Sequence, residues 1–153
     1  MFSKQEAAQL RKEFWTVFGQ YMSPIHSSEG EKINWINYKT GIKGLQFKME
    51  AGQTMASIGI VFTQPDKIQQ QLIFEQLMQS KNILHKILQE EWTWLLHTRD
   101  EQKKIVSKIY TAKTGVSTLK KEDWPELISF FKPRMIALDE FWNKVKYGFA
   151  EWQ

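Results

Sequence analysis

The sequence predicts an α+β fold: an antiparallel sheet of about four strands with three main helices, in the order α-β-β-α-β-β-α. Segments 45–62 and 92–111 alternate apolar and other residues with the period of two that is typical of strands. Three other segments repeat apolar residues at steps of three and four, as amphipathic helices do. The chain of 153 residues is 42% hydrophobic and long enough for one domain, residues 1–153.

The first helix is expected to begin after Ser3 and to end near Ser23-Pro24. Ser3 and Glu6 have the spacing of a capping box, in which each side chain bonds a backbone N–H of the other residue. The apolar stripe of this helix comprises Ala7, Leu10, Phe14, Val17, Phe18 and Tyr21.

The segment INWINYKTGIKG, residues 33–44, is expected to form a short strand and turn. Its Trp35 and Tyr38 are expected to pack on the core, since aromatic side chains mostly fill interiors. Its asparagines and glycines suit positive φ angles or side-chain bonds to the local backbone. The same mixture of aromatic and basic residues leaves a binding surface open as an alternative.

The first hairpin is expected at 45–62, with the turn at Gly52, and the second at 92–111. Between them one helix is expected, opened by Asp66 and Gln69 as a cap pair. Its buried face comprises Leu72, Ile73, Leu77, Leu84, Ile87 and Leu88. In the second hairpin, Trp92, Trp94 and Leu96 are expected on one face.

The last helix is expected to begin after Asp123, which would act as the cap, with Pro125 in the first turn. Its stripe is the longest in the chain and comprises Leu127, Phe131, Met135, Leu138, Trp142, Val145, Phe149 and Trp152. Pro133 lies inside this stripe and predicts a kink or break, because proline removes one backbone hydrogen bond.

Several classes of site are excluded by composition. The chain has no cysteine, which excludes disulfides, thiol nucleophiles and cysteine-ligated metal sites. The three histidines are far apart, no phosphate-binding loop or nucleophile motif occurs, and no cofactor or metal is expected. No segment has the apolar length of a signal peptide or membrane span, so we expect a cytoplasmic protein without a membrane anchor.

The net charge of +4 is concentrated in two basic blocks, residues 32–48 and 99–121. In the first strand, Gln46 and Lys48 face away from the apolar set; in the last, Lys108 and Tyr110 share a face. A sheet face with basic and aromatic groups could stack bases and follow phosphates, could bind a protein, or could simply be solvated. The candidate binding residues are Trp35, Tyr38, Lys39, Lys43, Lys48, Lys104, Lys108 and Tyr110.

We therefore expect a non-enzymatic binding or interaction module, as a monomer or homodimer, that engages nucleic acid or another protein. The alternative is a divergent metal-dependent nuclease or nuclease-associated domain, which needs clustered carboxylates beside a lysine. The acids to consider are Glu29, Glu31, Asp66 and Glu101, although Asp66 is expected to open a helix and Glu101 to lie in a turn.

The strings KINWINYKTG and WPELISFFKPRMIALDEFW resemble the bacterial family catalogued as domain of unknown function (DUF) 4268, over about residues 3–150. The resemblance implies a compact bacterial domain and supplies no catalytic residues to transfer. Some relatives carry nuclease-like N-terminal parts. These 153 residues leave no room for such a part, so we expect any nuclease association to come through a partner or a distant relative.

Overall fold

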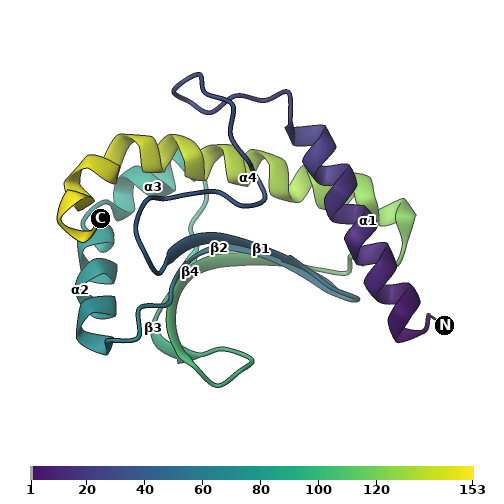
Figure 1. Cartoon of the computed structure of the whole chain (residues 1–153), viewed down its shortest axis with the longest axis horizontal. Helices are drawn as coiled ribbons and strands as arrows, with labels where there is room; N and C mark the ends of the chain where they lie inside the picture. Colours follow the sequence, from purple (N-terminus) through teal and green to yellow (C-terminus); the bar gives the residue numbers. More distant parts are fainter. Residues whose placement is uncertain (1) are drawn as a thin grey trace.

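Residues 2–153, described by a computed structural model, form four α-helices and one four-stranded antiparallel sheet (Figure 1). The predicted α+β class is confirmed, but the helix count of three is wrong. In chain order the elements are α1 (Lys4–Met22), β1 (Leu45–Ala51), β2 (Met55–Phe62), α2 (Lys67–Met78), α3 (Lys81–Leu88), β3 (Thr93–Arg99), β4 (Ile105–Thr114), α4 (Trp124–Val145) and the 3-10 segments Lys121–Asp123 and Lys146–Trp152.

Both predicted hairpins form, and the sheet order is β1-β2-β4-β3. The second strands of the two hairpins, β2 and β4, pair antiparallel in the centre of the sheet. Phe47 pairs with Ile60, and Ile60 pairs with Ile109, so apolar side chains form a row across one face. This row is the floor of the core.

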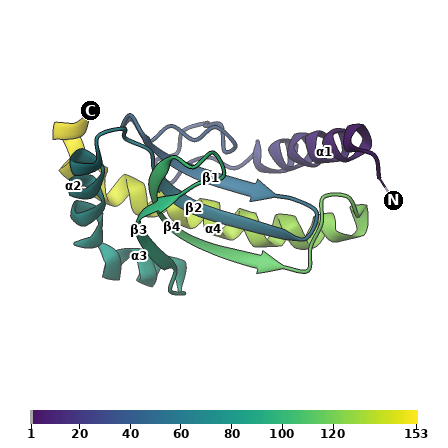
Figure 2. The same cartoon turned by 90° about the horizontal axis from the view of Figure 1, so that it is seen from below.

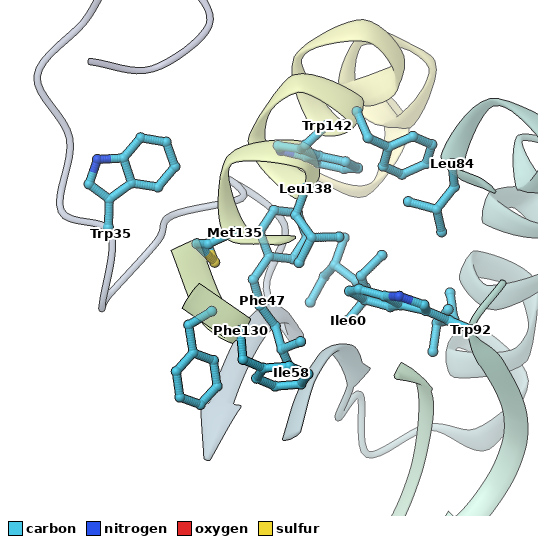
Figure 3. Packing of buried hydrophobic residues seen from close by; sticks show 14 of the residues in the cluster. Trp35, Phe47, Ile58, Ile60, Leu84, Trp92, Phe130, Met135, Leu138 and Trp142 are labelled. Carbon is cyan, nitrogen blue, oxygen red and sulfur yellow. The ribbon is translucent and has the colours of Figure 1, made fainter. Parts of the chain in front are cut away.

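Helix α4 lies across that face of the sheet (Figure 1). Figure 3 shows Leu138 and Trp142 of α4 pointing toward Phe47 of β1, with Ile60 of β2 beside them. Trp142 is 2% exposed, as the stripe predicts, and its indole Nε1 donates a 2.9 Å hydrogen bond to the Thr40 carbonyl. The stripe is fully buried at Leu127, Phe131, Met135, Leu138, Trp142 and Phe149, and half-buried at Val145 and Trp152.

Helix α4 is not broken at Pro133, contrary to one predicted outcome. Phe131 and Met135 flank the proline and are fully buried, so packing on both sides offsets the lost backbone bond. Asp123 precedes the helix but does not cap it with its side chain, which instead accepts a 3.0 Å hydrogen bond from the Ser117 N–H. Pro125 lies in the first turn, as predicted.

The predicted second helix is in fact two helices, α2 and α3, separated at Ser80. Asp66 caps α2 as predicted, accepting hydrogen bonds from the N–H groups of Ile68 and Gln69. Helix α2 stands at one end of the sheet while α3 lies beside α4 (Figure 1). One straight helix could not pack on both, which also explains why Leu72 is half exposed while Leu84 is fully buried.

The capping box of α1 forms as predicted between Ser3 and Glu6, and the helix ends at Met22. Its buried stripe is narrower than predicted, because α1 crosses only one end of α4 (Figure 1). Phe14 and Phe18 are fully buried, whereas Val17 and Tyr21 are exposed.

The connector, which we define as residues 23–44, contains no strand, so the strand predicted within 33–44 is wrong. Its predicted core packing is confirmed: Trp35 is 3% exposed and donates to the Ile25 carbonyl at 2.8 Å. The Asn34 side chain accepts from the N–H groups of Ile36 and Asn37, and this local bonding replaces a strand ladder.

The strand β3 contains a bulge between Leu95 and Thr98, where His97 has a φ of +51°. The bulge shifts the alternation of inward and outward side chains along β3. Leu96 is therefore exposed, whereas Trp92 and Trp94, which were expected on the same face, pack against the core. None of the helices in the part of the chain described here is long and apolar enough to cross a membrane.

Candidate binding site on the open sheet face

The face of the sheet opposite α4 is crossed by no helix of residues 2–153 (Figure 2). A groove of about 560 Å³ lies on this face, between the strands and the β3–β4 turn. It is lined by Gln46, Lys48, Glu50, Val61, Thr63, Arg99, Asp100, Glu101, Gln102, Lys104, Ile105, Val106 and Lys108. We call it the sheet groove.

Cations from both basic blocks meet in the sheet groove: Lys48 from the first, and Arg99, Lys104 and Lys108 from the second. Strand alternation predicts that Gln46 and Lys48 share one face of their strand and that Lys108 and Tyr110 share one face of theirs. The register shows that these are the same face of the sheet: Lys48 pairs with Gly59, which pairs with Tyr110, and Val61 pairs with Lys108. Opposing charges are present as well, and Lys48 forms a 3.0 Å ion pair with Glu50.

Hydrogen bonds within the β3–β4 turn fix the positions of two of these cationic residues, Arg99 and Lys104. The Asp100 carboxylate accepts 2.9 Å hydrogen bonds from the N–H groups of Gln102 and Lys104. Lys103 adopts a φ of +63°, and its carbonyl accepts a 2.9 Å bond from Nη1 of Arg99. These contacts occupy the Asp100 carboxylate, so its negative charge is partly neutralised by backbone donors.

Tyr110 lies on the same face, opposite Gly59 of β2. A Cβ atom at Gly59 would lie 2.7 Å from the Ile109 carbonyl oxygen and 2.8 Å from the Tyr110 Cβ, so only glycine allows this close approach. The Lys108 ammonium lies 4.4 Å from the centre of the Tyr110 ring. A partly exposed ring and a lysine therefore stand side by side next to the groove.

The remaining predicted binding residues do not reach the sheet groove. Tyr38 stacks on Phe47 in the core layer, with ring centroids 4.8 Å apart. Lys39 lines a different cavity, and Lys43 is exposed outside both. Trp35 is buried beneath a concavity of about 970 Å³ between α1 and residues 32–36, whose wall is mainly apolar.

A polar cluster that joins the connector to α4 is not among the predicted binding residues, apart from Tyr38. Asp139 of α4 is 1% exposed, and its Oδ1 accepts a 2.6 Å hydrogen bond from the Tyr38 hydroxyl. Its Oδ2 accepts a 2.7 Å bond from the Ser28 N–H, and Asn143 Nδ2 donates 3.1 Å to Oδ1. A sequence signal exists: Asp139 is four residues after Met135 and three before Trp142, so a charged group falls beside the buried stripe.

Two pKa shifts accompany the cluster. Burial, together with the hydrogen bond to Asp139, raises the pKa of Tyr38 far above its ordinary value. The hydrogen bond from Lys146, 2.8 Å from Glu29, lowers the pKa of that carboxyl, and the same bond raises the pKa of Lys146. Ionised Glu29 and protonated Lys146 therefore form a stable pair on the rim of the cluster.

The four acids considered for a nuclease are not brought together. Asp66 caps α2, and Glu101 lies in the β3–β4 turn, while Glu29 and Glu31 line one cavity beside Lys146. Within residues 2–153 no group of three histidine, aspartate or glutamate side chains could hold a metal ion.

The chain was compared with known protein families, curated proteins and solved structures. Residues 10–146 match the family described as "Domain of unknown function (DUF4268)". The chain belongs to this family. The resemblance noted in KINWINYKTG and WPELISFFKPRMIALDEFW is thereby confirmed, because both strings lie within the matched residues.

No curated protein and no solved structure matches this chain. For this DUF4268 domain, the assignment of a function therefore depends on its own geometry.

Proposed function

We propose that this DUF4268 domain is a non-enzymatic binding module that holds single-stranded nucleic acid in the sheet groove. The observation that carries the proposal is the meeting of Lys48, Arg99, Lys104 and Lys108 on a sheet face without a covering helix. Phosphate groups supply the complementary charge, and the release of their counterions would drive binding.

The aromatic group favours a single strand over a duplex. Tyr110 is partly exposed beside Lys108, and bases that are free of a duplex can stack on such a ring. The proposal also places the protein in the cytoplasm, where single-stranded nucleic acid is present.

The test is a fluorescence-anisotropy titration with a labelled oligonucleotide between about 50 and 200 mM salt, in which the log–log slope should be about −0.7 per phosphate contact. The double variant Lys48→Glu, Lys108→Glu should bind at least tenfold more weakly at the lowest salt. The matched control is Lys39→Glu, Lys43→Glu, which makes the same charge change outside the sheet groove.

No binding at the lowest salt would contradict the proposal, and equal weakening in both double variants would remove the sheet groove as its site. The same oligonucleotide incubated with Mg²⁺ or Mn²⁺ tests the nuclease alternative. Cleavage that Glu29→Gln or Glu31→Gln abolishes would favour that alternative, because these two acids share a cavity with Lys146.

A further inference from the structure

The connector and α4 line a second cavity, of about 370 Å³, which shares no residue with the sheet groove. Its wall combines residues 27–39 with three residues of α4 and its C-terminal extension, Asp139, Asn143 and Lys146. We call it the connector pocket. Its two walls come from segments more than 100 residues apart, held together by the 2.6 Å bond between Tyr38 and Asp139.

The inner wall of the connector pocket is fixed by hydrogen bonds. Asn143 Nδ2 donates 2.6 Å to the Ser28 hydroxyl, and Asn143 Oδ1 accepts 2.9 Å from Lys146. Lys146 also pairs with Glu29, while the Ser27 hydroxyl accepts from the N–H groups of Glu29 and Glu31. Side chains held in this way are preorganised, as the walls of small-molecule sites are.

Three exposed side chains of the same wall have no bonding partner in the protein. Within residues 2–153, the Glu31 carboxylate, the Lys39 ammonium and the Asn37 side-chain amide form no hydrogen bond or ion pair, although the charge of Glu31 contributes to the raised pKa of Lys146. They line the pocket together with the fixed Glu29–Lys146 pair.

The charges of the wall determine the class of ligand. Three carboxylates (Glu29, Glu31 and Asp139) face three ammonium groups (Lys32, Lys39 and Lys146), so the net charge of the wall is zero although both signs are present. A ligand that carries one carboxylate and one ammonium group matches this pattern, and a nucleic acid or a simple anion does not. The volume suits a molecule of amino-acid size.

From this geometry we propose that the connector pocket binds a free amino acid, whose carboxylate pairs with Lys39 and whose ammonium group pairs with Glu31. The two unused side chains thereby gain partners of opposite charge. The proposal is independent of the sheet groove, which shares no residue with the connector pocket.

The experiment measures the melting temperature of the full chain by differential scanning calorimetry, with each of the twenty L-amino acids added singly, up to about 10 mM where solubility allows. Binding to the folded state alone stabilises it by RT ln(1 + [L]/Kd), so the melting temperature rises with the logarithm of the ligand concentration above Kd. We expect at least one amino acid to raise it with this concentration dependence, and its N-acetyl and carboxamide derivatives, which lack one charge each, to have no effect.

Variants locate the effect. Lys39→Met and Glu31→Gln should each raise the dissociation constant of that amino acid tenfold or more. Lys43→Met, a change of the same kind in the same connector but outside the pocket, should leave it unchanged. An absence of any shift across the twenty amino acids, an equal shift from the blocked derivatives, or equal affinities in all three variants would each overturn the proposal. Oligonucleotide binding, measured on the same variants, reports on the sheet groove separately.

Discussion

Gly59 of β2 lies between Lys48 of β1 and Tyr110 of β4 in one cross-strand row of the sheet. Replacing Gly59 with Ala forces a Cβ to within 2.8 Å of the Tyr110 Cβ and 2.7 Å of a backbone oxygen. Neither neighbour is the end of a flexible side chain, so the strands must shift. We expect the free energy of unfolding to fall by about 1–3 kcal/mol, measured by urea denaturation.

The matched control is Gly148→Ala, in the C-terminal 3-10 segment, where an added Cβ meets no atom within 4 Å. Its stability should be unchanged or higher by up to about 1 kcal/mol, since alanine restricts the unfolded chain more than glycine does. Equal losses in the two variants would show that the close approach at Gly59 does not matter for stability.

Tyr38 supplies the second residue-scale prediction. Tyr38→Phe removes one hydrogen bond from the buried Asp139 carboxylate, and we expect a loss of about 1.5–3 kcal/mol at pH 7. The pKa of Tyr38 is raised on folding, so its contribution is complete below the unfolded-state pKa of about 10 and declines above it. The difference between wild type and variant should therefore shrink between pH 10 and 12.

Urea denaturation at pH 7, 10 and 11 measures that difference directly. Tyr21→Phe is the control, because Tyr21 is half exposed and its hydroxyl has no hydrogen bond within residues 2–153. If the difference for Tyr38→Phe stayed constant with pH, the buried link to Asp139 would not be the cause.

At the scale of the elements, the regular parts of the fold were predictable because their signals are local. Each of these signals involves residues within a few positions of one another. They are the alternation in the hairpins, the capping box of Ser3 and Glu6, the Asp66 cap and the apolar stripe of α4. The break at Ser80 was not predictable in this way. It depends on where α2 and α3 pack, against the end of the sheet and against α4, which is a property of the assembled molecule.

Trp142 tests the importance of the α4 stripe. Trp142→Ala empties a fully buried site between the helix and Phe47 and removes the bond to Thr40, and should cost about 3–5 kcal/mol. Tyr147→Ala removes an aromatic ring of similar size that is 70% exposed, and should cost less than about 0.5 kcal/mol. Thermal unfolding of both variants measures the contrast, and similar melting temperatures would contradict the placement of Trp142.

At the scale of the whole molecule, the connector lies against both α4 and the β1 edge of the sheet, since Tyr38 bonds Asp139 of the helix and stacks on Phe47 of the strand. Strand alternation was enough to place Lys48, Lys108 and Tyr110 on one face. Lys104 was a candidate binding residue because of its basic block, and Arg99 was not a candidate; the position of both depends on the β3–β4 turn. The connector pocket could not be predicted from local sequence patterns, because Tyr38 and Ser28 contact Asp139 across 101 and 111 residues of the chain.

The contacts between the connector and α4 predict that the connector can open while the sheet stays folded. Asp139→Ala removes the acceptor of two hydrogen bonds that hold the connector on α4, from the Ser28 N–H and the Tyr38 hydroxyl, and of a third within the helix, from Asn143. Proteolysis of a locally open segment follows the population of its open form, and each 1.4 kcal/mol lost raises that population about tenfold. In Asp139→Ala, trypsin should therefore cleave after Lys32 and Lys39 at least about tenfold faster than in the wild type.

Cleavage after Lys108, in the central strand β4, separates this local opening from general destabilisation. It requires the sheet to open, so its rate should change much less than the rates at Lys32 and Lys39. Mass spectrometry of the fragments at early times gives all three rates from one digest. If the three cleavage rates rose by the same factor, Asp139 would stabilise the whole domain, and the connector would not unfold locally while the sheet stays folded.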